Sequence, residues 1–217
     1  EREVLSRLAP DEAELLVHAA ACERFCASLC VALTGGGADS EPVVSALLAR
    51  LDNENLFIEP VQGPDRAPWY RLHPLLRETL AERFRQRSEA VRHQVHMAAW
   101  QWFRDHRLLV EAVRHAVLAG ESGTAADLVE RYSSTLIGRG EVRKGAGLLQ
   151  QLPKPEVRAR PALRLLTVQM QLYAHEVNAA RAELDALDGE LPAEGELRQR
   201  LRQLQMMWMV LTDNAEG

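Results

Sequence analysis

The sequence lacks the features that mark several specialised classes of protein. Aromatic residues make up only 5% of its 217 residues, and 13 glycines and 10 prolines are too few for a collagen-like, mucin-like or proline-rich disordered chain. No apolar run approaches the ~18 residues that span a bilayer, so we expect no membrane partner. An initiator methionine is also lacking. We therefore expect a piece of a longer protein, folded around one or two hydrophobic cores.

Cysteine is scarce, and the three cysteines lie together at intervals of four, as Cys22, Cys26 and Cys30. An odd number makes no disulfide framework and fits a reducing cytoplasm, where we place the protein. On one helix this spacing would put three thiols along one face. Zinc and iron–sulfur ligands usually lie closer together, on loops. We expect buried packing and no metal site, with metal binding and redox sensing as the alternatives.

The common signatures of catalysis are missing as well. The glycines at 35–37 follow a helix and lack the Gly-Lys-Ser/Thr of a phosphate-binding P-loop, and Gly138-x-Gly140 is not preceded by a strand. We interpret both segments as turns. His93 and His96 are not part of an H-E-x-x-H motif, and no serine lies in G-x-S-x-G. We expect no catalytic residue and no cofactor in this chain, which is not an enzyme by itself.

Positive charge gathers in one stretch only. The net charge is −5, which argues against a chain that binds nucleic acid strongly. Residues 65–107 nevertheless hold nine arginines against five acidic residues. Two interpretations stay open for this stretch: a solvated helix face, or a surface that faces phosphate groups.

Apolar residues recur at intervals of three and four along most of the chain, which is the period of an α-helix. The predicted helices precede and follow Pro10 and then cover about 25–33, 40–51, 74–84, 91–104, 109–118, 124–137, 141–152, 162–173, 179–187 and 197–211, with a break at 153–155. Between 56 and 72 the pattern alternates and turns aromatic, which predicts a small β-hairpin. Helices followed by a hairpin are typical of a winged-helix domain, here residues 1–87. Paired helices with short turns in 88–217 predict a tetratricopeptide-like α-solenoid. The expected fold is therefore mostly α.

Two segments of the predicted hairpin carry a resemblance. Asn55-Leu56-Phe57-Ile58-Glu59-Pro60 and the run Trp69-Tyr70-Arg71-Leu72-His73-Pro74-Leu75-Leu76-Arg77-Glu78-Thr79-Leu80 resemble a signature of the MalT-like, LuxR-type bacterial transcription regulators. Shorter matches between 29 and 51, and from Ala98 to Leu163, extend the resemblance to about residues 1–190.

Members of that family are signal-transduction ATPases of the STAND type. They carry a P-loop ATPase core, a winged helix, a helical sensor array and a C-terminal helix-turn-helix. The resemblance implies that this chain is the middle of such a regulator, and that it couples the nucleotide state of the ATPase core to the helical array. Its partners would be the ATPase core of the same chain and a small-molecule inducer or regulatory protein at the array. DNA would bind only to the C-terminal domain, and ATP or ADP only in the full-length protein.

His73 is the one candidate cofactor-binding residue. In STAND proteins a histidine in an "M-H-D" motif, at the start of the last winged-helix helix, often contacts the β-phosphate of ADP. Leu72 and Pro74 stand here in place of Met and Asp. A histidine before a helix N-terminus adds a donor where an anion is already favoured. The alternative is that His73 caps the helix or packs between the wing and the helix.

Two other functions remain as alternatives, a non-catalytic protein-interaction adaptor and a winged helix that binds DNA itself. A recognition helix that reads DNA should be basic. The candidate segment, residues 39–51, has only Arg50 against Asp39 and Glu41. This composition argues against DNA reading.

Overall fold

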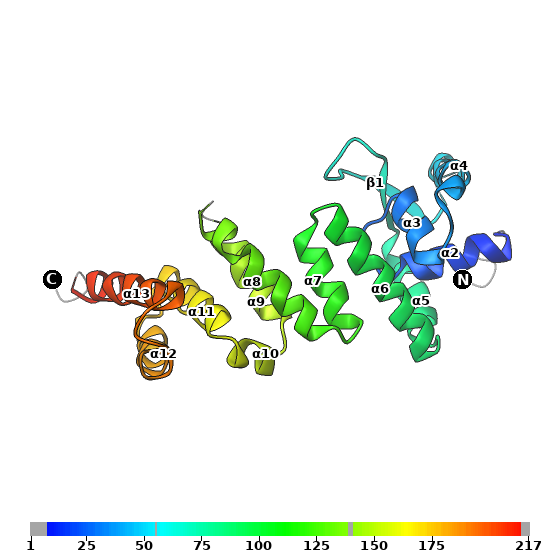
Figure 1. The fold of residues 1–217 in the computed structure, drawn as a ribbon. Helices are drawn as coiled ribbons and strands as arrows, with labels where there is room; N and C mark the ends of the chain where they lie inside the picture. Colours follow the sequence, from blue (N-terminus) through cyan, green and yellow to red (C-terminus); the bar gives the residue numbers. More distant parts are fainter. Residues whose placement is uncertain (1–7, 55, 139–140, 214–217) are drawn as a thin grey trace. The chain divides into compact units, whose positions relative to one another are not determined.

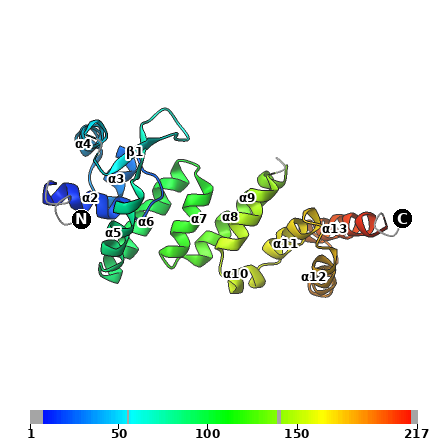
Figure 2. The same ribbon diagram turned by 180° about the vertical axis from the view of Figure 1, so that it is seen from behind.

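The computed structural model describes residues 8–54, 56–138 and 141–213. Contacts between residues divide the chain into two compact units. The first unit runs up to Leu108 and includes Leu118–Gly120, and the second comprises Leu109–Val117 and the residues from Glu121 on. Figures 1 and 2 show the order of the elements from two sides. The described chain is mostly helical with one small sheet, which confirms the predicted fold class.

The first unit holds the elements of a winged helix. In chain order they are α2 (Pro10–Ala19), α3 (Ala27–Thr34), the 3-10 helix η1 (Ala38–Ser40), α4 (Glu41–Asn53), β1 (Ile58–Val61), β2 (Trp69–Leu72), α5 (Pro74–Arg85) and α6 (Glu89–Asp105). Helix α3 ends at Gly35, whose φ of 70° is left-handed, and this confirms the glycines as a helix stop. The helix predicted before Pro10 falls largely on residues 1–7, outside the described residues.

The predicted hairpin is present and is tied to the helices. Strands β1 and β2 pair antiparallel, from Ile58 opposite Leu72 to Val61 opposite Trp69. Phe25, just before α3, exchanges two backbone hydrogen bonds of 2.8 Å with Tyr70. The sheet is therefore held by the residues that precede α3 as well as by its own turn.

The loop between the two strands is fixed by Trp69, whose side chain is only 1% exposed. Its indole Nε1–H donates to Asp65 Oδ1 at 2.9 Å, and the Ala67 N–H donates to the same oxygen at 3.0 Å. A Cβ atom at Gly63 would lie 1.9 Å from Trp69 Cδ1. The Trp69 ring also packs edge-on against Trp102 of α6, with ring centroids 5.8 Å apart. The loop therefore packs closely over a buried aromatic pair.

The three cysteines are buried free thiols, which confirms the packing interpretation. They do not share one helix, because Cys22 lies in the turn after α2 and Cys26 is the N-cap of α3, so only Cys30 lies within the helix. The chain must turn between two packed helices here, and no four-residue spacing can show that. Burial raises the pKa of the Cys26 and Cys30 thiols, which disfavours the reactive thiolate.

The second unit is a series of helices. They are α7 (Leu109–Leu118), α8 (Ser122–Gly138), α9 (Val142–Gln151), α10 (Lys154–Ala159), α11 (Pro161–Tyr173), α12 (Val177–Glu190) and α13 (Glu196–Asp213). The break predicted at 153–155 is confirmed at its start, because α9 ends at Gln151 and neither Leu152 nor Pro153 is helical. The short helix α10 that follows is not predicted by the sequence pattern; Pro155 lies in its first turn, where proline is tolerated. Residues 139–140, in the turn predicted at 138–140, lie outside the described residues.

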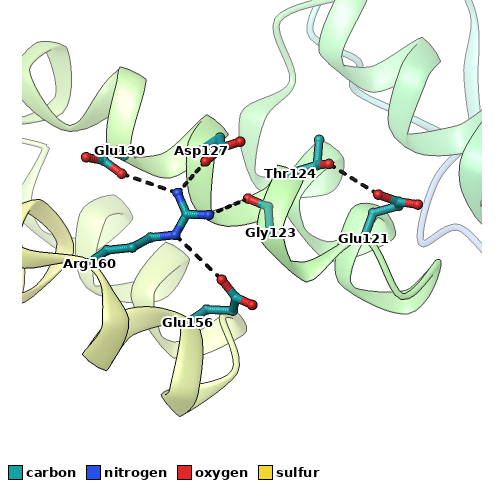
Figure 3. A network of polar contacts seen from close by, with 7 residues as sticks. All are labelled: Glu121, Gly123, Thr124, Asp127, Glu130, Glu156 and Arg160. Atoms are coloured by element: carbon teal, nitrogen blue, oxygen red, sulfur yellow. Dashed lines mark hydrogen bonds and ion pairs between the residues drawn. The ribbon is translucent and has the colours of Figure 1, made fainter.

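Two kinds of interaction hold the second unit together. Leucines of α11, α12 and α13, among them Leu172, Leu184 and Leu201, form a buried apolar cluster. Before these helices in the sequence, Arg160 connects α8 to the junction of α10 and α11 (Figure 3). Its guanidinium pairs with Asp127 and Glu130 of α8 and donates to the Gly123 carbonyl at 3.2 Å. One partly buried cation therefore stands at the meeting point of three helices.

The predicted division into domains 1–87 and 88–217 stays a prediction. Helix α6 follows that boundary, yet it packs against α3 and is grouped with the first unit. The grouping reflects packing, and truncation after residue 87 or residue 108 would locate the boundary of the folding unit.

Candidate functional site

His73 is held in place by its backbone between β2 and α5. Its N–H donates to the Phe57 carbonyl at 2.7 Å, and its own carbonyl accepts from the N–H groups of Leu76 and Arg77 at 3.0 and 2.9 Å. Phe57 itself has a left-handed φ of 68°. The residue is thus the N-cap of α5, and the hairpin determines where it lies.

The His73 side chain makes no capping hydrogen bond to α5 and is 50% exposed. His73 therefore caps α5 by its position in the backbone and not by a hydrogen bond from its imidazole. Its Nε2 lies 3.9 Å from Glu59 Oε1 on β1. The same carboxylate accepts from Nε of Arg71, its partner across the sheet, at 2.9 Å. The imidazole is thus accessible at the edge of the wing, and its contact with ADP stays a prediction.

A groove of about 660 Å³ lies beside the start of α5. Its charged lining residues are Arg71, Arg77, Arg85, Glu23 and Glu78. Of the three arginines, two are paired, Arg71 with Glu59 and Arg85 with Glu82. Arg77 has no ion-pair partner among the described residues.

The first turn of α5 carries no acidic residue. An anion there would meet the positive end of the helix dipole and the Arg77 guanidinium, with His73 close by in the chain. The groove is thus a part of the basic stretch where a phosphate would meet positive charge. Arg87 and Arg104, farther along that stretch, are paired with Glu14 and Asp105.

Sequence reasoning noted the arginines of this groove but missed Glu23. Glu23 lies in the turn between α2 and α3, about fifty residues before the rest of the groove. A lone glutamate in a turn carries no periodic or spacing signal, so only the fold could bring it here.

The remaining candidate residues do not come together. His93 is exposed, whereas His96 is buried with its ring edge-on to Phe84 at 5.4 Å. Across the part of the chain that the structure describes, no three His, Cys, Asp or Glu side chains gather as they would around a metal ion. Within the same residues, no helix has both the length and the apolar character needed to cross a membrane.

Helix α4 is the candidate recognition helix of the winged helix. Its single basic residue, Arg50, bonds Glu12 of α2 through Nη2 at 2.6 Å. Its first turn carries Glu41. The structure therefore adds no positive surface to α4 that would favour contact with DNA.

Comparison with known proteins agrees with this arrangement. Residues 1–92 match the family model of the MalT winged helix domain. The serine/threonine-protein kinase PknK of Mycobacterium tuberculosis is 28% identical over 98% of this chain and 19% of its own length. The HTH-type transcriptional regulators MalT of Vibrio cholerae and Yersinia pestis are 26% and 27% identical, over 87% and 90% of this chain and 21% and 22% of theirs. No solved structure matches the chain.

These matches cover most of this chain, but the chain spans only about a fifth of the length of the curated relatives. The match at residues 1–92 includes the elements from α2 to α5 and the first turn of α6. Residues 1–92 therefore match a MalT winged helix domain, and this domain together with the helices after it is similar to one stretch of the MalT regulators.

Proposed function

We propose that this chain is the middle part of a MalT-like, ATP-dependent regulator and acts as its coupling element. The winged helix would respond to ADP or ATP in an ATPase core elsewhere in the same protein. The helical array would receive the signal, either a small-molecule inducer or a regulatory protein. This chain would contribute no catalytic residue, and DNA would be bound by a separate C-terminal domain.

The observation that carries this proposal is the position of His73. Its imidazole is accessible, its backbone is fixed by hydrogen bonds on both sides, and it caps a helix whose first turn has no acidic residue. Arg77, one turn into that helix, has no ion-pair partner among the described residues. These residues suit a nucleotide phosphate, which His73 and Arg77 would hold by charge and hydrogen bonding.

The mechanism is a shift between two states. Contacts from the winged helix to ADP would favour the closed, resting form of the regulator. A signal at the array would favour the open form, in which those contacts are lost. A ligand shifts such an equilibrium only by its difference in affinity for the two states. A residue that contacts ADP in one state is therefore the residue through which nucleotide and signal are coupled.

The comparisons favour a coupling function for this chain over a function tied to one activity, such as phosphorylation or transcription. The relatives named above are a protein kinase and transcriptional regulators, and both kinds match nearly the whole of this chain. A segment shared by proteins with different named activities suits a switch that serves several outputs.

The coding DNA on both sides of this segment tests the proposal. We expect a G-x-x-x-x-G-K-[ST] motif before residue 1 and a helix-turn-helix after residue 217. A reading frame that begins near Glu1 and stops near Gly217 would leave the winged helix without an ATPase to report on. In that case the adaptor alternative would replace the coupling function.

A further inference from the structure

A cavity of about 430 Å³ lies within the second unit, where α9, α10, α11 and α12 meet. Its volume falls in the range of small-molecule sites, roughly 300–1,000 Å³. It belongs to the helical array and shares no residue with the groove beside α5. Its lining therefore has to be interpreted by its own chemistry.

Part of the lining is aliphatic. Leu149 of α9, Leu152 of the following turn and Val157 of α10 border the cavity, and Leu149 and Val157 are half-buried. Half-buried aliphatic side chains that line a cavity keep apolar surface in contact with water. Covering that surface with a hydrocarbon group is favourable.

The same cavity is bordered by two cations on α10, Lys154 and Arg158, four residues apart and therefore on one face of the helix. Both are exposed, and neither has an ion-pair partner among the described residues. The acidic residue of α10, Glu156, does not neutralise them, because it lies 3.5 Å from Nε of Arg160 on the side shown in Figure 3. Two like charges at this spacing repel each other until an anion binds.

The acidic side chain of the lining is already engaged. Glu183 of α12 pairs with Arg164 of α11, which is only 13% exposed and also binds Glu190. These two carboxylates raise the pKa of Arg164 and keep it charged. Arg164 and Glu183 thus neutralise each other. The charged residues of the lining that have no ion-pair partner among the described residues are Lys154 and Arg158 of α10.

We infer that this cavity binds a small organic anion with an aliphatic chain, a carboxylate of medium length being the simplest example. The hydrocarbon would contact Leu149, Leu152 and Val157, and the carboxylate would pair with Lys154 and Arg158. This site is separate from the nucleotide proposal and stands whether or not His73 contacts ADP.

Octanoate is the probe for the test, with octylammonium and octan-1-ol as matched cationic and neutral probes. Calorimetric titration of the 217-residue chain should show one octanoate site with a dissociation constant of about 1 mM or below. Octylammonium should bind at least about tenfold more weakly, because it makes the same aliphatic contacts but its positive charge is repelled by Lys154 and Arg158. Equal binding of the two ions, or no saturable octanoate binding up to about ten times that concentration, overturns the inference.

Paired variants locate the site. The double variant Lys154→Gln, Arg158→Gln removes two exposed cations and should leave the helical circular dichroism unchanged. It should weaken octanoate at least about tenfold and leave octan-1-ol unaffected. Arg143→Gln, an exposed cation of α9 outside the cavity lining, is the control and should bind octanoate like the parent chain. Equal octanoate affinity in the double variant and the control overturns the assignment to this cavity.

Discussion

His18 of α2 is a largely buried imidazole, with 14% of its side chain exposed. Its Nε2 lies 3.3 Å from Glu14 Oε1, and Glu14 also pairs with Arg87, just after α5. Burial is the largest influence and lowers the pKa of His18; Glu14 raises it and Arg87 lowers it. His18 therefore binds a proton less readily in the folded protein than in the unfolded chain.

The stability of the first unit should fall as the pH drops below the ordinary histidine value of about 6.5, because the unfolded state then binds more protons than the folded state. The slope from this one group is at most about 1.4 kcal/mol per pH unit. Urea unfolding at pH 7.5, 6.5 and 5.5 measures it. His18→Gln should make the free energy of unfolding depend less on pH. His93→Gln, at an exposed site, should leave the pH dependence of the parent chain unchanged. Parallel curves for the His18 variant and the parent chain would contradict the account.

Gly63 is required by the close approach of Trp69, since a Cβ atom would lie 1.9 Å from the ring. Gly63→Ala should cost about 1–3 kcal/mol, because the hairpin loop or the buried indole must move. Gly37→Ala is the control: its Cβ would meet no atom within 4 Å, and its φ is −77°. The denaturant midpoint of each variant measures its stability, and tryptophan fluorescence shows whether the buried indole has moved. A Gly63 variant as stable as the Gly37 variant would show that the loop is not closely packed.

At the scale of elements, most of the helices and the hairpin could be predicted from the spacing of apolar residues and from the residues typical of turns. The errors occurred where tertiary packing decides. Pro153 indicates a break and α9 does end before it, yet no pattern predicts the short helix α10 that begins at Lys154. Cys22 and Cys30 have helical spacing, yet the chain turns between them. Local rules assign propensity, and contacts with distant elements decide between the conformations that propensity allows.

Arg160 is the element-scale contact that sequence could not show, because its partners in α8 lie about thirty residues away. Arg160→Ala should destabilise the second unit by about 1–2 kcal/mol, since it removes three ion pairs and a bond to the Gly123 carbonyl from a side chain that is 25% exposed. Lys144→Ala, which breaks an exposed pair with Glu141, should change stability by less than about 0.5 kcal/mol. Thermal unfolding monitored at 222 nm compares them. Equal losses would mean that the Arg160 network adds nothing beyond a surface pair.

At the scale of the whole molecule, the sequence predicted which residue to examine but not its surroundings. His73 follows from a short run of residues beside a helix start. The groove next to it needs Glu23, Arg71 and Arg85 from three separate elements, which only the fold brings together.

The two units should be separable. A fragment of residues 1–108 should unfold cooperatively in urea, because it keeps α6, which packs against α3 and supplies Trp102 to Trp69. A fragment of residues 1–87 lacks α6 and should unfold at a lower urea concentration. Equal midpoints would instead place the domain boundary after residue 87, as the sequence predicts.

The central claim is that the winged helix reports nucleotide state through His73. The most direct measurement is the rate at which ADP dissociates from the full-length protein carrying His73→Ala, compared with the parent and with His93→Ala. A hydrogen bond to a charged phosphate contributes about 1.5–3 kcal/mol, so the His73 variant should release ADP roughly 10–100 times faster, with higher activity before any signal. The His93 variant should match the parent. ADP release and basal activity unchanged in the His73 variant would contradict the coupling function.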